Sequence, residues 1–352
     1  MASVAVQRFV ARTLLSLPTP ILRLMSGGGV TYVGGRTLDP RLQFLAAQGR
    51  NAAPINSLSP QDVRRGEVTG LAAVSAGLER GVTCTTLSVP GASGDIPARL
   101  YQPTRQDASG PLMVWAHMGG GVIGTLDTSH GFCGLLAQIT QAPVLSVDYR
   151  LAPEHRFPAG LEDMLTAFRW ARAQAETFGA TGVAVGGDSM GGSFAAVVCQ
   201  ELKRGGEDQP VLQLLMYPCT DVASETMSMA TYAEAFPLNR AMMDWFMGHY
   251  MPADADPADP RLSPGREDDL AGLAPAIVAT AGFDPLIDQG AAYALTLREA
   301  GVTTVYRAYD SLCHGFASFT GAVPVADAAC RQIAGLVRKP CVCCKNFNKA
   351  AL

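Results

Sequence analysis

Gly187-Asp188-Ser189-Met190-Gly191-Gly192 is the stretch that decides the fold of this 352-residue chain. The apolar segment 183–185 precedes it, and residues 193–198, Ser-Phe-Ala-Ala-Val-Val, follow it with a composition that suits a buried helix. The pattern G-x-S-x-G between a strand and a helix is typical of a sharp turn that lifts a serine hydroxyl out of a sheet. Glycines suit positions 187 and 191 because a Cβ there would clash with neighbouring backbone. We therefore predict that Ser189 is a nucleophile, and that the N-terminus of the following helix stabilises the oxyanion that its attack creates.

Short apolar segments on both sides of this turn indicate a parallel sheet. Such segments, when they alternate with helices, are typical of a sheet that helices cover on both faces, so the expected fold class is α/β. Two alternating segments, 83–89 and 96–101, are expected to form an antiparallel pair beside it. The other expected strands are 112–116, 144–147, 182–185, 211–216, 276–280 and 303–306, and the expected helices include 160–178, 191–204 and 290–300.

The order of these elements divides the chain into parts. Residues 1–75 are expected to be helical, and residues 76–220 with 265–338 to form the catalytic domain. Residues 221–264 contain two helical segments and no expected strand. Two interpretations of this insertion stay open: a lid above the carboxyl edge of the sheet, which we favour, or a helical excursion packed away from the site. Residues 339–352 are expected to be a frayed or non-native tail.

Among the five histidines, His314 is the expected base for Ser189. In sheet enzymes with this serine turn, the acid and then the base follow the serine along the chain. Of the two histidines after Ser189, His249 lies within a helical segment of the insertion, whereas His314 lies in an expected loop just past the strand 303–306. A loop at the carboxyl end of a strand is where a catalytic base belongs, so we predict His314.

Asp284 is the expected partner of this base, because it directly follows the strand 276–280. It would orient the imidazole and stabilise the imidazolium without taking the proton. Asp288 is expected to be a capping or structural carboxylate, and Asp310 is too close to His314 in sequence to reach it easily from a separate strand.

The segment His117-Met-Gly-Gly-Gly121 follows the strand 112–116 and is expected to form an oxyanion hole. Glycine-rich loops at this place supply backbone N–H donors, together with the residue after the nucleophile. We assign Gly119, Gly120 and Met190 as the donors. His117 is expected to hold the loop and not to face the substrate.

Composition narrows the function classes further. The formal net charge is −4, so the chain offers no electrostatic basis for nucleic-acid or anionic membrane binding, and no segment is apolar enough to span a membrane.

Nine irregularly spaced cysteines predict a reduced, cytoplasmic protein with no disulfide framework. Cys341, Cys343 and Cys344 lack a fourth ligand nearby, so we expect no metal site there. Residues 6–17 are expected to form an amphipathic helix that packs on the body, with Val6, Phe9, Val10, Thr13, Leu14 and Leu17 on its apolar face.

These motifs, with Asp148-Tyr-Arg-Leu-Ala-Pro-Glu154, Phe157-Pro-Ala, Asp284-Pro-Leu and His314-Gly-Phe, resemble the hormone-sensitive-lipase family of esterases, bacterial family IV. The similarity runs from about residue 36 to residue 334. It implies an α/β-hydrolase sheet of about eight strands, a helical cap built from the N-terminus and residues 221–264, and hydrolysis of short- to medium-chain acyl esters without a cofactor. It also implies that Arg150 and Glu154 belong to a structural polar network.

Two departures from the family pattern bear on the site. The family reads His-Gly-Gly-Gly followed by an aromatic residue, whereas Met118 replaces the first glycine here and Gly121 replaces the aromatic residue. Methionine would be strained if that glycine used a positive φ, so we expect a displaced loop or a reshaped pocket. Ile287 and Gln289 replace the Arg and Glu that the family favours, and are expected to affect surface pairing or a subunit contact, as in a homodimer.

The predicted function is a serine carboxylesterase that forms an acyl-enzyme on Ser189 and acts on a small-molecule ester. An amidase or acyltransferase could use the same residues. A ligand-binding protein on the same scaffold, as in plant hormone receptors that resemble this family, would have lost the base, and His314 disfavours that alternative.

Overall fold

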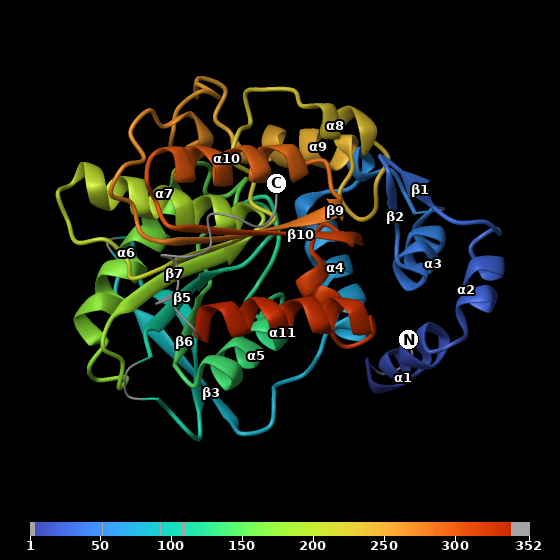
Figure 1. Ribbon diagram of the computed structural model, residues 1–352, viewed down its shortest axis with the longest axis horizontal. Helices are drawn as coiled ribbons and strands as arrows, with labels where there is room; N and C mark the ends of the chain where they lie inside the picture. Colours follow the sequence, from blue (N-terminus) through green and yellow to red (C-terminus); the bar gives the residue numbers. More distant parts are fainter. Residues whose placement is uncertain (1–3, 51, 92, 108–109, 339–352) are drawn as a thin grey trace.

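An eight-stranded sheet forms the centre of the protein in the computed structural model, which describes residues 4–50, 52–91, 93–107 and 110–338 (Figure 1). The strands are β3 (Val82–Val89), β4 (Ile96–Pro103), β5 (Leu112–Ala116), β6 (Val144–Val147), β7 (Val183–Asp188), β8 (Gln213–Met216), β9 (Ala276–Phe283) and β10 (Thr304–Cys313). Their spatial order is β10-β9-β8-β7-β5-β6-β4-β3. Only the pairs β3–β4 and β4–β6 are antiparallel, so the predicted α/β fold with a mostly parallel sheet is confirmed.

Helices cover both faces of this sheet. One face carries α5 (His130–Thr140) and α11 (Pro324–Arg338), and the other carries α6 (Ala159–Gln174), α7 (Met190–Arg204) and α10 (Ile287–Glu299). Burial on both faces of the sheet explains why the sequence of strand β5 is apolar throughout. Leu112, Val114 and Ala116 are buried in the core on the α6–α7 side, whereas Met113 and Trp115 alternate with them and are buried in the core on the α5–α11 side.

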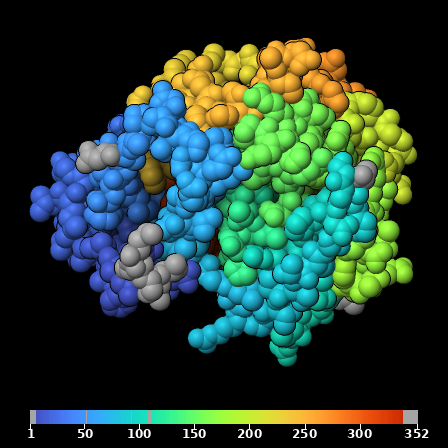
Figure 2. All heavy atoms as spheres, turned by 180° about the vertical axis from the view of Figure 1, so that it is seen from behind, coloured from blue at the N-terminus to red at the C-terminus, as the bar shows by residue number. Residues whose placement is uncertain are grey.

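The N-terminal part is mainly helical, as predicted, and covers one end of the molecule in Figures 1 and 2. It also contains a two-stranded hairpin that the sequence analysis missed, formed by β1 (Tyr32–Val33) and β2 (Arg36–Thr37). Its helices are α1 (Val4–Leu15), α2 (Thr19–Met25), α3 (Pro40–Gly49), η1 (Ile55–Ser57) and α4 (Pro60–Val74).

The insertion 221–264 contains two short helices and no strand. They are α8 (Met227–Thr231) and α9 (Arg240–Tyr250), and η2 (Pro264–Arg266) ends the insertion. We expected the first helical segment of this insertion to span residues 226–236, but α8 ends at Thr231 because Tyr232 already leaves helical geometry. The remaining 3₁₀ helix, η3 (Phe316–Phe319), follows β10.

Helix α1 forms where its periodicity predicts it, but only part of its predicted apolar face packs on the body, through Leu14 and, just past the helix, Leu17. Phe9 is 71% exposed, and Val6 and Val10 are also exposed. The opposite side of the helix contacts the body, with Leu15 buried and Arg8 Nε donating to the carbonyl of Ala72 in α4 at 3.1 Å. Apolar spacing alone therefore indicated the helix without indicating which side faces its neighbour.

No helix in the described ranges is both long and apolar enough to cross a lipid bilayer. The tail 339–352, with Cys341, Cys343 and Cys344, lies outside the described residues.

Candidate active site

Ser189 occupies the sharp turn between β7 and α7. Its backbone has φ 55° and ψ −120°, a conformation that costs energy in an L-residue and that the surrounding structure must enforce. The flanking glycines allow this turn. A Cβ on Gly187 would lie 2.2 Å from the carbonyl oxygen of Gly191, and a Cβ on Gly191 would lie 2.1 Å from that of Ala116. The turn therefore requires glycine at both positions, and it holds the serine at the carboxyl edge of the sheet.

His314 and Asp284 lie beside this serine at the same edge. Ser189 Oγ is 2.8 Å from His314 Nε2, and His314 Nδ1 is 2.7 Å from Asp284 Oδ2. All three side chains are buried, and Asp284 is 0% exposed. Asp284 Oδ1 also accepts a hydrogen bond from the backbone of Leu286 at 2.8 Å, which fixes the carboxylate plane. The structure thus brings together the three side chains that the sequence analysis selected.

The strand before His314 is longer than predicted. Strand β10 continues to Cys313 with a register shift against β9 between Tyr309 and Cys313, so the expected loop 310–313 is wrong. Polar Asp310 and Ser311 hid this continuation from the apolar pattern, because the end of an outer strand needs no apolar side chains. His314 is consequently the first residue beyond a strand, as Asp284 is beyond β9.

The rejected candidates have other partners. His249 lies in α9, away from Ser189, and its ring contacts Trp245. Asp288 accepts a hydrogen bond from the backbone of Ser228 at 2.8 Å near the start of α8, which confirms its predicted structural role. Asp310 is exposed and pairs with Arg36 at 3.0 Å.

The loop after β5 carries three glycines with positive φ, at 128° for Gly119, 62° for Gly120 and 72° for Gly121. The backbone N–H groups of Gly119 and Gly120 donate to no acceptor within the described part of the chain, so they are available to a substrate oxygen. Met118 does not adopt a positive φ, so the condition for strain at this residue is not met. Its side chain instead lines the cavity and reaches towards Gly315, next to His314.

Two aromatic rings of α9 lie against the glycines of this loop. A Cβ on Gly120 would be 2.4 Å from Phe246 Cγ, and a Cβ on Gly121 would be 2.5 Å from Tyr250 Cδ2. Tyr250 therefore fills the space beside position 121, where the resembling family carries its own aromatic side chain. The reshaped pocket expected from the sequence stays a prediction, which this contact supports.

Asp188 is a buried carboxyl group behind the serine to which the sequence analysis gave no role. Burial raises the pKa of Asp188 to about 7, although hydrogen bonds from Tyr217, Ser129 and the Met118 backbone favour its charged form. His117 is fully buried, with Nδ1 2.8 Å from the Met118 carbonyl oxygen, and burial lowers the pKa of His117 to about 4. Both side chains lie within hydrogen-bonding distance of the Met118 backbone and so hold the start of the glycine loop, as predicted for His117. An acidic residue directly before the nucleophile was the sequence signal for Asp188.

Ile287 and Gln289 lie inside the protein, so their predicted role in surface pairing or a subunit contact is wrong. Each is only 4% exposed. The Gln289 side chain accepts from the backbones of Thr220 and Asp221 and donates to the carbonyl of Asp221 at 2.7 Å. It therefore anchors the start of the insertion 221–264.

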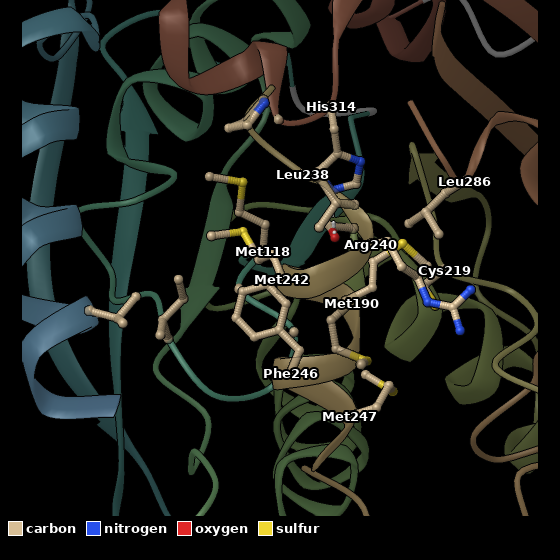
Figure 3. Close-up of a pocket in the computed structure, with 18 of the residues that line it drawn as sticks. Met118, Met190, Cys219, Leu238, Arg240, Met242, Phe246, Met247, Leu286 and His314 are labelled. Carbon is tan, nitrogen blue, oxygen red and sulfur yellow. Dashed lines mark hydrogen bonds between the residues drawn. The ribbon is translucent and has the colours of Figure 1, made fainter. Parts of the chain in front are cut away.

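A cavity of about 790 Å³ opens above Ser189 and His314. Side chains from the N-terminal helices, the insertion and the glycine loop line it, and Figure 3 shows His314, Met118, Met190, Phe246 and Met247 gathered around it. Seven of the thirteen methionines of the chain are in this lining, which suits a wall that adapts to substrates of different shape. They are Met118, Met190, Met229, Met242, Met243, Met247 and Met251.

The described residues contain no group of three or more His, Cys, Asp or Glu side chains arranged to hold a metal ion.

Comparison with known proteins agrees with this geometry. Residues 113–318 match the family described as alpha/beta hydrolase fold. The chain is 44% identical to carboxylic ester hydrolase LipN of Mycobacterium tuberculosis over 311 residues, which cover 85% of this chain and 82% of that protein. It is 36% identical to ethyl acetate hydrolase of Pseudomonas putida, with 81% and 92% of the two chains covered.

Among solved structures, the ester-hydrolase EH1AB1 from the metagenome of Lake Arreo superimposes with a TM-score of 0.82 at 39% identity, covering 86% of this chain and 99% of that one. The chain therefore belongs to the α/β-hydrolase fold family, among the bacterial esterases that resemble hormone-sensitive lipase.

Proposed function

We propose that this chain is a serine carboxylesterase that hydrolyses short- to medium-chain acyl esters, with Ser189 as nucleophile, His314 as general base and Asp284 as the partner of the base. The continuous hydrogen-bonded series from Ser189 Oγ through His314 to Asp284 is the observation that carries this proposal. Serine is a poor nucleophile without such a base, and the relatives that are named esterases support carboxylic esters as substrates.

The proposed reaction has two steps. Ser189 Oγ forms a bond to the ester carbonyl carbon while its proton passes to His314 Nε2, and His314 then gives that proton to the leaving alcohol. Water then attacks the acyl carbon while its proton passes to His314 Nε2, and the bond between that carbon and Ser189 Oγ breaks as His314 returns the proton to Oγ, which releases the carboxylic acid. In both steps the negative oxygen would accept hydrogen bonds from the backbones of Gly119, Gly120 and Met190. Asp284 would hold the Nδ1–H of His314 and stabilise the imidazolium.

The cavity supports an uncharged substrate with a moderately large acyl or alcohol group. Its walls are mainly apolar, and the one arginine among the lining residues, Arg240, already pairs with Glu225 at 2.7 Å and Asp244 at 2.8 Å. Residues of α9 and of the N-terminal helices line the cavity together. We therefore propose that residues 1–75 and 221–264 form the cap, and that residues 76–220 and 265–338 form the catalytic domain.

The alternatives keep the same residues and differ in the acceptor or the leaving group. An amidase would need to protonate an amine, and an acyltransferase would need to exclude water in favour of an alcohol.

The proposal also includes a cytoplasmic location, which the free thiols of the six described cysteines support. A homodimer remains a prediction.

Activity on p-nitrophenyl esters graded from acetate to decanoate tests this proposal. We expect turnover by the wild-type protein, and a fall in kcat of roughly a million-fold in Ser189→Ala because the three side chains act as a unit. A fluorophosphonate reagent followed by peptide mapping should label Ser189. Equal activity in Ser189→Ala, or labelling at another residue, would contradict the assignment.

A further inference from the structure

Two polar side chains of α4 contact the glycine loop. Arg64 Nε donates to the carbonyl oxygen of Val122 at 2.8 Å, and Glu67 Oε2 accepts from the backbone N–H of Gly124 at 2.9 Å. The two residues are three positions apart, so they lie on one face of the helix. A helix of the N-terminal part thus holds two backbone groups of the loop that carries the oxyanion donors.

The loop between these contacts is a closed turn. The backbone N–H groups of Val122 and Ile123 both donate to the carbonyl oxygen of Gly119 at 2.9 Å, and Gly121 accepts from Ala152 at 2.8 Å. Because the turn is closed, a displacement of Val122 moves Gly119 with it. Gly119 and Gly120 have no side chains of their own to fix their position, so their N–H groups depend on the bonds that anchor the turn.

Arg64 is itself held in place. Its Nη2 donates to the carbonyl of Ala152 and to Glu154 Oε2, both at 2.7 Å, and its Nη1 donates to Glu154 Oε1 at 2.9 Å. The hydrogen bond from Arg64 lowers the pKa of Glu154 to about 2, so the pair stays charged over the working pH range. Arg64 therefore links α4, the loop after β5 and the segment 148–154, whose Glu154 the resemblance placed in a structural network.

We propose that Arg64 and Glu67 are positioning residues that set the place of the Gly119 and Gly120 N–H groups relative to Ser189. This inference rests on the proposed esterase mechanism and adds to it. Val63, Gly66, Glu67 and Leu71 of the same helix also line the cavity. Helix α4 therefore both lines part of the cavity and supports the loop that carries the oxyanion donors. The N-terminal part of the cap then contributes to the rate of acyl transfer as well as to binding.

Glu67→Leu tests the proposal, because leucine fills similar space and cannot accept from Gly124. We expect kcat to fall between about tenfold and 100-fold, since a displacement near 1 Å at a reacting centre costs about that much, with KM within about threefold of wild type. Binding of a trifluoromethyl ketone, whose adduct with serine carries an oxyanion, should weaken by the same factor as kcat/KM. Glu67→Gln keeps an acceptor oxygen and should recover kcat to within about threefold of wild type.

Arg65→Met is the matched control. Arg65 is exposed on the same helix and is not itself a lining residue of the cavity, and its printed ion pair is with Asp62, at the edge of the lining, and not with the glycine loop. The substitution Arg65→Met removes a charge from α4 and should leave kcat unchanged.

A second variant, Arg64→Lys, keeps the charge beside Glu154 but loses the fixed Nε donor to Val122, and should lower kcat in the same way even if Glu67→Leu fails to fold. Folded Glu67→Leu or Arg64→Lys protein with wild-type kcat would overturn the inference, as would a rise in KM alone. Failure of the proposed function looks different: the wild-type protein itself would then show no Ser189-dependent ester hydrolysis.

Discussion

Replacing Gly119 by alanine should disable the oxyanion donors while leaving the fold intact. A Cβ on Gly119 would lie 2.0 Å from the carbonyl oxygen of Ile123, whereas ordinary contact begins at 3.4 Å, so the turn must open by the difference, 1.4 Å. The φ of 128° adds strain for any L-residue. A shift of about 1 Å costs roughly 100-fold, and losing one oxyanion donor costs about 100 to 1,000-fold. We therefore expect kcat to fall by about 100 to 1,000-fold, or about 3 to 4 kcal/mol of transition-state stabilisation.

Steady-state kinetics with a short p-nitrophenyl ester, together with a thermal melt, make the measurement. Gly206→Ala is the matched control, because Gly206 also has a positive φ, 67°, but a Cβ there meets nothing within 4 Å and the residue is not in the cavity lining. Both variants should lose about 1 to 2 kcal/mol of stability from backbone strain, and only Gly119→Ala should lose activity. Wild-type kcat in folded Gly119→Ala protein would refute the assignment of this loop as the oxyanion hole.

Three further predictions concern the support of the site. Asp284→Asn should lower kcat by about 10⁴-fold in initial-rate assays, because the amide would stabilise the wrong histidine tautomer; a loss below tenfold would contradict this. Asp188 holds its proton up to about pH 7 in the folded protein and only to about pH 4 when unfolded, so stability should fall as pH rises between these values, by on the order of 4 kcal/mol. Urea titrations should show that Asp188→Asn reduces this slope without abolishing it, because burial also raises the pKa of Glu67 to about 7; an unchanged slope would assign it to other groups. Met118→Gly should lower the melting temperature, at a cost of about 0.5 to 1 kcal/mol, because the methionine is unstrained; a higher melting temperature would show that strain was present.

Sequence patterns predicted those features that depend on local chemistry. The apolar segments 112–116 and 144–147 match β5 and β6 residue for residue, since strands buried on both faces need continuous apolar side chains. The serine turn was recognisable because its glycines are required by contacts as short as 2.1 Å. Chain order then selected Asp284 and His314, which the structure brings into contact with Ser189.

Features that depend on distant partners were not predictable in the same way. The apolar spacing of α1 indicated a helix, but the position of α4 decides that Phe9 faces outwards. Gln289 resembles a surface residue in sequence, yet three hydrogen bonds to the segment 220–221 make it an internal anchor. Arg64 and Glu67 carried no signal beyond two charged residues on a helix, because their partners are backbone groups about 60 residues away.

The contact between Tyr250 and Gly121 restricts which side chains two distant positions can carry together. Any side chain at 121 would begin 2.5 Å from the tyrosine ring, so the aromatic bulk that related esterases carry on the loop is supplied here by α9. Gly121→Phe alone would collide with the ring, and Tyr250→Gly alone would leave a void beside the nucleophile's loop. A hybrid that joins the lid of another esterase to this sheet should therefore keep the residues at positions 121 and 250 compatible, which is met when the lid and the loop beneath it come from the same parent.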